Sequence, residues 1–499
     1  MNRATKLKFN TITSLLYQIL SIVSGFILPR LILQNYGSDI NGVVSSITQF
    51  LAIISLCECG VGAVVQSALY KPLAEKNVDE LSKIYVSSNN FFRKVAAILA
   101  LYIVVLIVVF PHINDGGFDF AFTATLIISI SIGTMAQYYF GITNQLVLNA
   151  SQLIYMQMLM RIVCLIINVV LSIFLMNNGA SIQVVKLTSS LIFLIQPVFY
   201  AIIVKRKYVI NKKITYTDEP IKQKWNGMAQ HVATVVFENT SVLVLTVLST
   251  LENVSVYSVY HMVTNGLKLF FVSMTSAMKP YLGDLYARNE IDKLNKDFGK
   301  FEWLMHTCST LIFTVAGILI VPFVKVYTLG ITDAEYIQPL FGFFLCLSMA
   351  IYTIRLPYSY MILSAGHFKQ TQTSAIIEAT LNIIISVVFV WKFDLIGVGI
   401  AATVAMIYRT VYFVRYLSRD ILNRDVKIFL KHIFVDAISS IIMVLSTLWI
   451  DMTSTTYFGW ILMACLVGVI CVIEVVVINT IFFKDRIKSL INDRRLKHE

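Results

Sequence analysis

Apolar runs of about 20 residues follow one another along the chain and are separated by short polar segments. A helix needs about 20 apolar residues to cross the hydrocarbon core of a bilayer, whereas helices and strands buried in a soluble protein need fewer. Only 14% of the 499 residues are charged, and soluble domains usually carry about 25%. The sequence therefore predicts an all-α, polytopic integral membrane protein.

Turn and charge signals divide these runs into fourteen predicted spans. They lie near residues 10–33, 42–69, 84–110, 120–148, 152–176, 182–204, 226–250, 254–281, 301–326, 338–362, 371–392, 396–416, 429–450 and 457–483. At about 20 residues per span, they leave only short loops and no room for a second soluble domain.

The net charge of +12 is distributed unevenly along the chain. Of the 40 Lys and Arg residues, 32 fall in alternate loops and in the two tails, whereas the intervening loops carry acids such as Asp39, Glu252 and Asp451. This is the positive-inside asymmetry of a multi-pass protein whose two termini are cytoplasmic. The basic charge thus indicates topology and does not require a nucleic-acid partner.

A basic linker and an internal repeat predict two lobes of six spans each. When the second half is shifted back by 213 residues, the loop after span eight lies over the loop after span two, and Asp292 meets Asp79. Because six is an even number, the two copies would be parallel repeats with a pathway between them. The predicted parts are an N-lobe at 1–204, a basic cytoplasmic linker at 205–224, a C-lobe at 225–418, and the last two spans with a basic cytoplasmic tail at 419–499.

Six basic residues lie within the predicted spans or near their ends: Arg30, Arg161, Lys186, Lys268, Arg355 and Arg409. A basic side chain that faces lipid at the bilayer midplane costs about 2.5–3.5 kcal/mol, so these residues should face protein or water. Helical spacing places polar neighbours on the same faces, as for Gln157, Arg161 and Asn168. We expect a cavity whose cations bind a phosphate; the alternative is salt bridges between helices, such as Glu378 with Arg409.

Acids and amides within the spans complete the candidate site. Glu58, Glu238 and Glu378 are candidates for ion coupling, whereas Asp436 and Glu474 lie outside the repeat and are predicted to be structural or oligomeric. The candidate sugar contacts are Gln137, Tyr138, Asn144, Gln157 and Asn265. Ring faces and amides suit a sugar, but amide groups also join packed membrane helices.

Signatures of enzymes and cofactors are absent from the sequence. There is no GxxxxGK[ST] motif, because Gly299 and Lys300 are followed by Phe301, and there is no HExxH motif. The seven cysteines all fall within apolar spans, which predicts neither structural disulfides nor a zinc site. We therefore expect a protein that is not an enzyme and that has no catalytic residues, cofactor or metal.

Short motifs resemble those of the polysaccharide flippases. Residues 26–42 (FILPRLILQNYGSDING) resemble the exit of span one in that family, with a proline before a YG turn and a second glycine. Residues 57–62 (CECGVG) resemble its acidic-x-glycine element in span two, with Glu58 as the acid. Residues 257–260 (YSVY) and the loop at 287–300 are also similar, so the resemblance runs over spans one to twelve.

The family is the O-antigen and capsule repeat-unit (Wzx-type) flippase branch of the multidrug/oligosaccharidyl-lipid/polysaccharide exporter superfamily. The resemblance implies two six-helix lobes around a central cavity, here with two further C-terminal helices, in the cytoplasmic (inner) membrane of the cell. The implied cargo is an undecaprenyl-diphosphate-linked oligosaccharide, such as an O-antigen, capsule or exopolysaccharide repeat unit. The lobes would carry it from the cytoplasmic to the outer leaflet by alternating access, among membrane lipids and with the polysaccharide polymerase machinery as a partner.

Other functions make different demands on the sequence. An ion-coupled multidrug or metabolite antiporter of the same superfamily is the main alternative, and acids rather than bases should then dominate its cavity. A membrane-embedded polymerase or glycosyltransferase would need a larger loop for its acid and base residues. Lipid II flippases carry an arginine at the position of Leu28, which argues against a peptidoglycan precursor as cargo. The driving force would be the membrane potential or an ion bound at Glu58 or Glu238.

Overall fold

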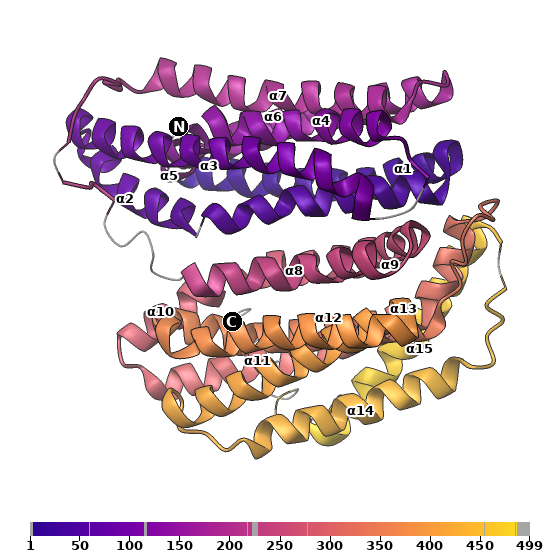
Figure 1. Cartoon of the computed structure of the whole chain (residues 1–499). Helices are drawn as coiled ribbons and strands as arrows, with labels where there is room; N and C mark the ends of the chain where they lie inside the picture. The colour runs from indigo at the N-terminus through magenta and orange to yellow at the C-terminus, as the bar shows by residue number, and fades with distance from the viewer. Residues whose placement is uncertain are drawn as a thin grey trace. The chain divides into compact units, whose positions relative to one another are not determined.

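The structure is a computed structural model that describes residues 3–58, 60–113, 117–216, 218–221, 228–276, 278–453, 455–484 and 486. Helices make up most of the described residues, and no strand occurs among them (Figure 1). The chain divides into two compact units, Met1–Ser255 and Val256–Glu499. The predicted all-α class is thus confirmed.

The described part of the first unit contains ten helical elements. They are α1 (Arg3–Ala52), the 3-10 helix η1 (Ile53–Glu58), α2 (Val61–Glu75), α3 (Val78–Ile113), α4 (Phe120–Ala136), the π-helix η2 (Gln137–Gly141), α5 (Ile142–Ala150), α6 (Ile154–Asn177), α7 (Ile182–Lys207) and α8 (Met228–Leu248). The division between the units falls inside α9 (Leu251–Thr275). The second unit continues with α10 (Met278–Ala287), α11 (Ile291–Tyr327), α12 (Pro339–Ser364), α13 (Phe368–Asp420), α14 (Lys427–Thr447) and α15 (Tyr457–Phe482).

Two of the long elements each consist of two helices joined by a sharp bend. Gly37 interrupts α1 with φ 85° and ψ 176°, at the YG pair that the sequence marks as a turn. Asp394 interrupts α13 with φ 44° and ψ −121°. The second half of α13 runs back along the first, since the hydroxyl of Tyr412 donates a hydrogen bond to the carbonyl of Gln370 (3.1 Å).

Counting these bends brings the helices into agreement with the predicted spans. Eleven segments in the described part of the chain are long and apolar enough to cross a membrane. Two of them, Phe9–Glu58 and Phe368–Asp420, include a bend and so supply two spans each. The predicted eighth span corresponds to α9, whose polar residues keep it out of the eleven. Together these elements give the expected count of about fourteen spans.

The helix boundaries follow the internal repeat seen in the sequence. Helix α3 begins at Val78, and α11 begins at Ile291, which lies 213 residues further along the chain. Both helices directly follow a short helix, α2 in the first copy and α10 in the second. The limits predicted for the two lobes stay a prediction. Helix α8 belongs to the first unit, where the hydroxyls of Ser46 and Thr246 are hydrogen-bonded (2.7 Å).

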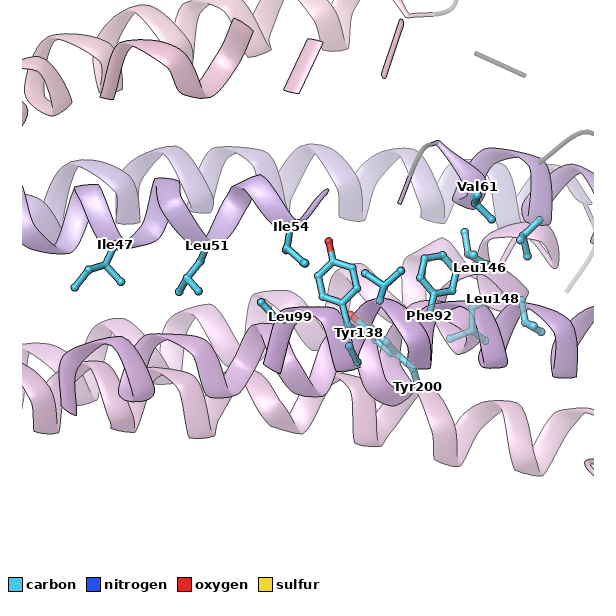
Figure 2. Packing of buried hydrophobic residues seen from close by; sticks show 14 of the residues in the cluster. Ile47, Leu51, Ile54, Val61, Phe92, Leu99, Tyr138, Leu146, Leu148 and Tyr200 are labelled. Carbon is cyan, nitrogen blue, oxygen red and sulfur yellow. The ribbon is translucent and has the colours of Figure 1, made fainter. Parts of the chain in front are cut away.

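The core of the first unit is formed by apolar side chains of several helices. Figure 2 shows Ile47 and Leu51 of α1 on one side of this core, with Phe92 and Leu99 of α3 on the other. The ring of Tyr138 lies between them. Its hydroxyl donates to the carboxylate of Glu58. The packing therefore places a carboxylate at the edge of an apolar core.

Gly42 marks the closest approach between α1 and the beginning of α9. A β-carbon at this position would lie 2.0 Å from the carbonyl oxygen of Leu251. Nearby, the amide of Asn41 donates a hydrogen bond to the hydroxyl of Ser255 (2.8 Å), and both side chains are buried. The absence of a side chain at position 42 thus allows two backbones to meet.

Replacing Gly42 with alanine should destabilise the protein by about 1–3 kcal/mol, the usual cost of overpacking. The carbonyl of Leu251 belongs to the backbone and cannot rotate away, so α1 and α9 must separate. The shift in the thermal unfolding midpoint of the purified protein measures this effect. Gly25→Ala is the matched control, because a β-carbon there meets nothing within 4 Å and alanine favours the helix. Equal midpoints for both variants would contradict the prediction.

Candidate functional site

A buried carboxylate on α13 binds two arginines from neighbouring helical segments. Glu378 is 2% exposed, and one carboxylate oxygen accepts a hydrogen bond from Arg355 of α12 (2.5 Å). The other oxygen accepts from Arg409, which lies on the second half of α13. The bend at Asp394 makes this possible, since it brings residues 378 and 409 to facing positions on two antiparallel segments. Both arginines are nearly fully buried.

Aromatic rings complete this group, which we call the Glu378 cluster: Glu378, Arg355, Arg409, Tyr352, Phe413 and Lys268. The guanidinium of Arg409 lies 5.0 Å from the ring centroid of Phe413. On α12, the ring of Tyr352 lies between Arg355, at 5.3 Å, and the amino group of Lys268 of α9, at 5.4 Å. Cations at these distances from a ring face are attracted by its quadrupole. Three cations therefore gather around one carboxylate within a single unit.

The sequence left two interpretations of these cations open, namely phosphate binding and salt bridges between helices, and the cluster has features of both. The salt bridge between Glu378 and Arg409, given as the alternative to substrate binding, is present. On the first half of α13, Thr371, Glu378 and Asn382 form a polar helix face that points into protein, because all three are at most 2% exposed. Lys268 is only half-buried and shares its helix face with Asn265 and His261, and His261 stacks on Tyr257. Lys268 is thus the accessible cation of the Glu378 cluster.

The other three predicted cations belong to the first unit. Arg161 of α6 lies over the ring of Tyr17 of α1, with 5.8 Å between the guanidinium carbon and the ring centroid. On the same helix, Gln157 and Asn168 are buried, so this face points into the unit as helical spacing predicts. Lys186 of α7 and Arg30 of α1 are half-buried. The six cations therefore form two sets of three, one in each unit.

The acids proposed for ion coupling occupy different surroundings. Glu58 ends the 3-10 helix η1, just before Gly60 takes a left-handed conformation (φ 72°), and it accepts the hydroxyl of Tyr138. The predicted second span is thus a broken helix, and its acid lies at the break. Glu238 lies on an exposed face of α8. Glu378 has both of its oxygens bound by arginine.

The candidate sugar contacts are largely used for internal hydrogen bonds. Gln157 donates to the carbonyl of Gln145 (3.1 Å) and to the side chain of Asn149 (2.9 Å). Asn144 accepts from the hydroxyl of Tyr85 (3.0 Å). Gln137 begins the π-helix η2 and donates to Gln145 (2.7 Å). Such π-turns are frequent at functional sites, so the side chains closest to this irregular segment, Gln137 and Tyr138, are the stronger candidates.

A second buried ionic group, which the sequence analysis missed, joins α11 to α14. We call it the Glu302 network: Glu302, Tyr358, Arg424, His432, His306 and Asp436. Glu302 is 1% exposed, accepts the hydroxyl of Tyr358, and binds Arg424 at 2.5 Å. A turn further along α11, His306 contacts Asp436 of α14 at 2.5 Å and stacks on His432 with 4.8 Å between ring centroids.

A further hydrogen bond from α11 reaches the last helix. The indole of Trp303 donates to the side chain of Asn479 of α15 (2.8 Å). Asp436, expected to be structural, thus belongs to a set of polar contacts that fasten the two C-terminal helices to α11. The available signal is the presence of two histidines and two acids at positions predicted to lie within spans. Such groups need polar partners in a membrane.

The chemistry of these two ionic groups is different. In the Glu302 network, acids outnumber arginines, and histidines fill the remaining places. In the Glu378 cluster, cations outnumber acids, and Lys268 is its half-buried cation. Guanidinium and ammonium groups suit phosphate oxygens, and low surrounding polarity strengthens such contacts. The Glu378 cluster can thus bind an anion.

Comparison with solved structures identifies the fold. A structure of the lipid II flippase MurJ in an inward closed conformation has a TM-score of 0.66 at 16% identity and covers 96% of this chain and 99% of its own. An inward-facing multidrug resistance MATE family transporter of the MOP superfamily has a TM-score of 0.62 at 15% identity, covering 81% and 94%. A eukaryotic MATE transporter has a TM-score of 0.58 at 12% identity, covering 86% and 98%.

These similarities define the class: the chain is a polytopic membrane protein with the fold of the MOP exporters. The resemblance that the sequence motifs indicate is thereby confirmed at the level of the fold. No protein-family model matches the sequence, and a search of curated protein sequences found no match.

Proposed function

We propose that this protein is a flippase for an undecaprenyl-diphosphate-linked oligosaccharide, such as an O-antigen, capsule or exopolysaccharide repeat unit. It would move this lipid from the cytoplasmic to the outer leaflet of the cell membrane, with both of its own termini in the cytoplasm. The proposal describes a transporter rather than an enzyme. It is supported by a fold shared with a lipid II flippase and by the motifs at residues 26–42 and 57–62.

The observation that carries the proposal is the Glu378 cluster. A diphosphate loses hydration when it leaves water, and cationic side chains must replace that hydration. Arg355 and Arg409 are already buried and are held in place by Glu378. Lys268 is half-buried beside the ring of Tyr352, and it would bind a phosphate while both salt bridges of Glu378 remain. In this arrangement the arginines set a positive potential, and Lys268 makes the first contact.

The first unit contains further candidates for substrate contact. Arg161, Lys186 and Arg30 would serve as phosphate-binding cations, and Gln137 and Tyr138 would contact sugar hydroxyls and rings. Two irregular segments lie in this unit. The π-helix Gln137–Gly141 follows α4, and the predicted second span is broken at Gly60. Broken helices recur at the sites of transporters because their free backbone groups face a cavity. Membrane lipids and the polymerase machinery would be the partners.

The proposal is tested by removing the gene and measuring lipid-linked sugars on each side of the membrane. The strain that lacks the gene should accumulate an undecaprenyl-linked oligosaccharide on the cytoplasmic face, and the wild-type gene should reverse this. Lys268→Ala should fail to reverse it, because losing a charge-assisted hydrogen bond to the phosphate costs about 1.5–3 kcal/mol, which is about tenfold or more in affinity. Lys293→Ala is the matched control, since Lys293 is exposed and forms only a surface pair with Glu290 (3.7 Å).

Two outcomes would count against this function. A normal distribution of lipid-linked sugars in the deleted strain would contradict the flippase. If that strain instead lost resistance to cationic compounds, the protein would be an ion-coupled multidrug antiporter, which the MATE-like fold also supports. In that case Glu58 and Glu238, rather than the cations, would be the residues to replace.

A further inference from the structure

A groove of about 540 Å³ runs along the last three turns of α13. Its lining residues are Tyr408, Val411, Tyr412, Arg415, Tyr416, Arg419 and Asp420, and we call it the Tyr–Arg groove. The spacing of 408, 412, 415 and 419 places these side chains on one face of the helix. The groove lies within the second unit and is separate from the Glu378 cluster, whose Arg409 points to the buried face of the same helix.

The tyrosines of the groove are held in place before any ligand binds. The rings of Tyr412 and Tyr416 are parallel, with 6.1 Å between centroids and 6° between planes. The hydroxyl of Tyr412 donates to the carbonyl of Gln370 (3.1 Å), and the hydroxyl of Tyr416 lies 2.7 Å from Nδ1 of His367. Both partners come from the turn and first residues that begin α13. The packing of the second half of α13 against its beginning therefore fixes the position of both tyrosines.

The arginines of the groove, in contrast, project outwards. The side chain of Arg419 is 88% exposed, and its nearest acid, Asp420, lies at 3.9 Å. Arg415 is also exposed. An exposed ion pair at that distance contributes little energy, so it does not compete strongly with another anion. Two guanidinium groups one turn apart can bind the oxygens of a phosphate group in the fork geometry that arginine favours.

The position of the groove relative to the bilayer indicates the ligand. The predicted twelfth span ends near residue 416, so Arg415 and Arg419 lie where the basic cytoplasmic segment begins. Tyrosines and arginines are typical of this interface, and basic pockets between helices there bind lipid headgroups. Towards the middle of the helix, the same side of α13 exposes Val404, Ile407 and Val411. A polar end followed by an apolar strip matches a headgroup followed by acyl chains.

We propose that the Tyr–Arg groove binds the headgroup of an anionic phospholipid from the cytoplasmic leaflet. Arg415 and Arg419 bind its phosphate, the edges of Tyr408 and Tyr412 flank the glycerol, and an acyl chain follows Val411 and Ile407. The phosphate of the transported lipid has the same chemistry, but the groove is lined by exposed and half-buried side chains and does not include the buried Arg409, which fits a lipid that stays with the protein. This assignment is independent of which substrate the protein moves.

The test is native mass spectrometry of the full-length protein titrated with phosphatidylglycerol or with phosphatidylcholine. The wild type should bind phosphatidylglycerol about tenfold more tightly than phosphatidylcholine, a difference of about 1.4 kcal/mol. Arg415→Gln with Arg419→Gln should abolish that preference. The matched control is Lys205→Gln with Arg206→Gln, which removes two exposed charges from the last turn of α7. This control should keep the preference, because it removes the same charge from a surface outside the groove.

Three results would overturn the assignment. The wild type could bind the two lipids equally, or the groove variant could keep the preference, or the control variant could lose it to the same extent. Displacement of phosphatidylglycerol by an equal amount of undecaprenyl phosphate would assign the groove to the transported lipid instead. Both arginines are exposed, so the groove variant should unfold at the same temperature as the wild type. An unchanged unfolding temperature would show that the lost lipid preference is not caused by misfolding.

Discussion

Glu378→Gln should lower the free energy of unfolding by about 3–5 kcal/mol, the range found when one partner of a buried ion pair is removed. The variant leaves Arg355 and Arg409 facing each other across a neutral amide, with both side chains about 7% exposed. An amide can accept only part of the two arginine hydrogen bonds, and it cannot compensate their charges. Unfolding of the purified protein in mixed micelles measures the change.

Glu290→Gln is the matched control for this variant. It makes the same chemical change in a surface pair, where Glu290 lies 3.7 Å from Lys293 and both side chains are more than 40% exposed. Exposed pairs are worth about 0–1 kcal/mol, so this control should be close to wild type. A loss below about 1 kcal/mol for Glu378→Gln would mean that water reaches the cluster, and the arginines would then count as cavity residues rather than structural ones.

The helical spans are the part of the structure that the sequence predicts best, because the need for about 20 apolar residues acts locally. The two bends are also marked by local sequence signals. Gly37 follows a tyrosine in a recognisable turn pair, and Asp394 lies between two predicted spans. The break at Gly60 is different, since it lies inside the apolar run predicted as the second span. Hydropathy alone cannot distinguish a continuous helix from a broken one there.

The polar partners of the site are harder to predict, because they depend on which helix faces meet. The pair Glu378 and Arg409 was foreseeable, since adjacent spans joined by a short turn must be antiparallel neighbours. Glu302 was not, because it stands at the beginning of a predicted span, where charges are common. Its partner Arg424 lies 122 residues further along the chain, in a predicted loop. Likewise, helical spacing correctly places Gln157 on an inward-facing side of its helix. The spacing does not reveal that internal hydrogen bonds occupy the amide of Gln157.

The Glu302 network and the hydrogen bonds of α1 with α8 and α9 would behave differently during transport. The Glu302 network joins α11 to α14, and Trp303 extends the contact to α15. These polar contacts would keep the C-terminal helices attached to α11 while other helices move. Helix α1 contacts α8 through the hydroxyls of Ser46 and Thr246, and it contacts α9 through the amide of Asn41 and the hydroxyl of Ser255. Contacts of that strength, about 1 kcal/mol each, can break and form again during a transport cycle.

Joining Ser46 and Thr246 by a disulfide should therefore abolish transport. Their hydroxyl oxygens are 2.7 Å apart, so sulfur atoms at the two positions can approach the disulfide bond length of about 2.0 Å. Ser46 belongs to the predicted N-lobe and Thr246 to the predicted C-lobe, on the side of the acidic outer loop that contains Glu252. In alternating access, this end must open to release the cargo outwards. Ser46→Cys with Thr246→Cys should lose activity on oxidation and regain it on reduction, as measured by the flipping of lipid-linked sugars in membrane vesicles.

Ser88→Cys with Thr143→Cys provides the matched control. These hydroxyls are 3.1 Å apart and equally buried, but both lie within the predicted N-lobe, on α3 and α5. A disulfide there should leave transport unchanged, because a lobe that moves as a rigid body keeps its internal distances. If oxidation left the Ser46 and Thr246 pair fully active, the predicted lobes could not separate at this contact, and the pathway would have to open elsewhere. If the control pair also lost activity, transport would instead require rearrangement inside the N-lobe itself.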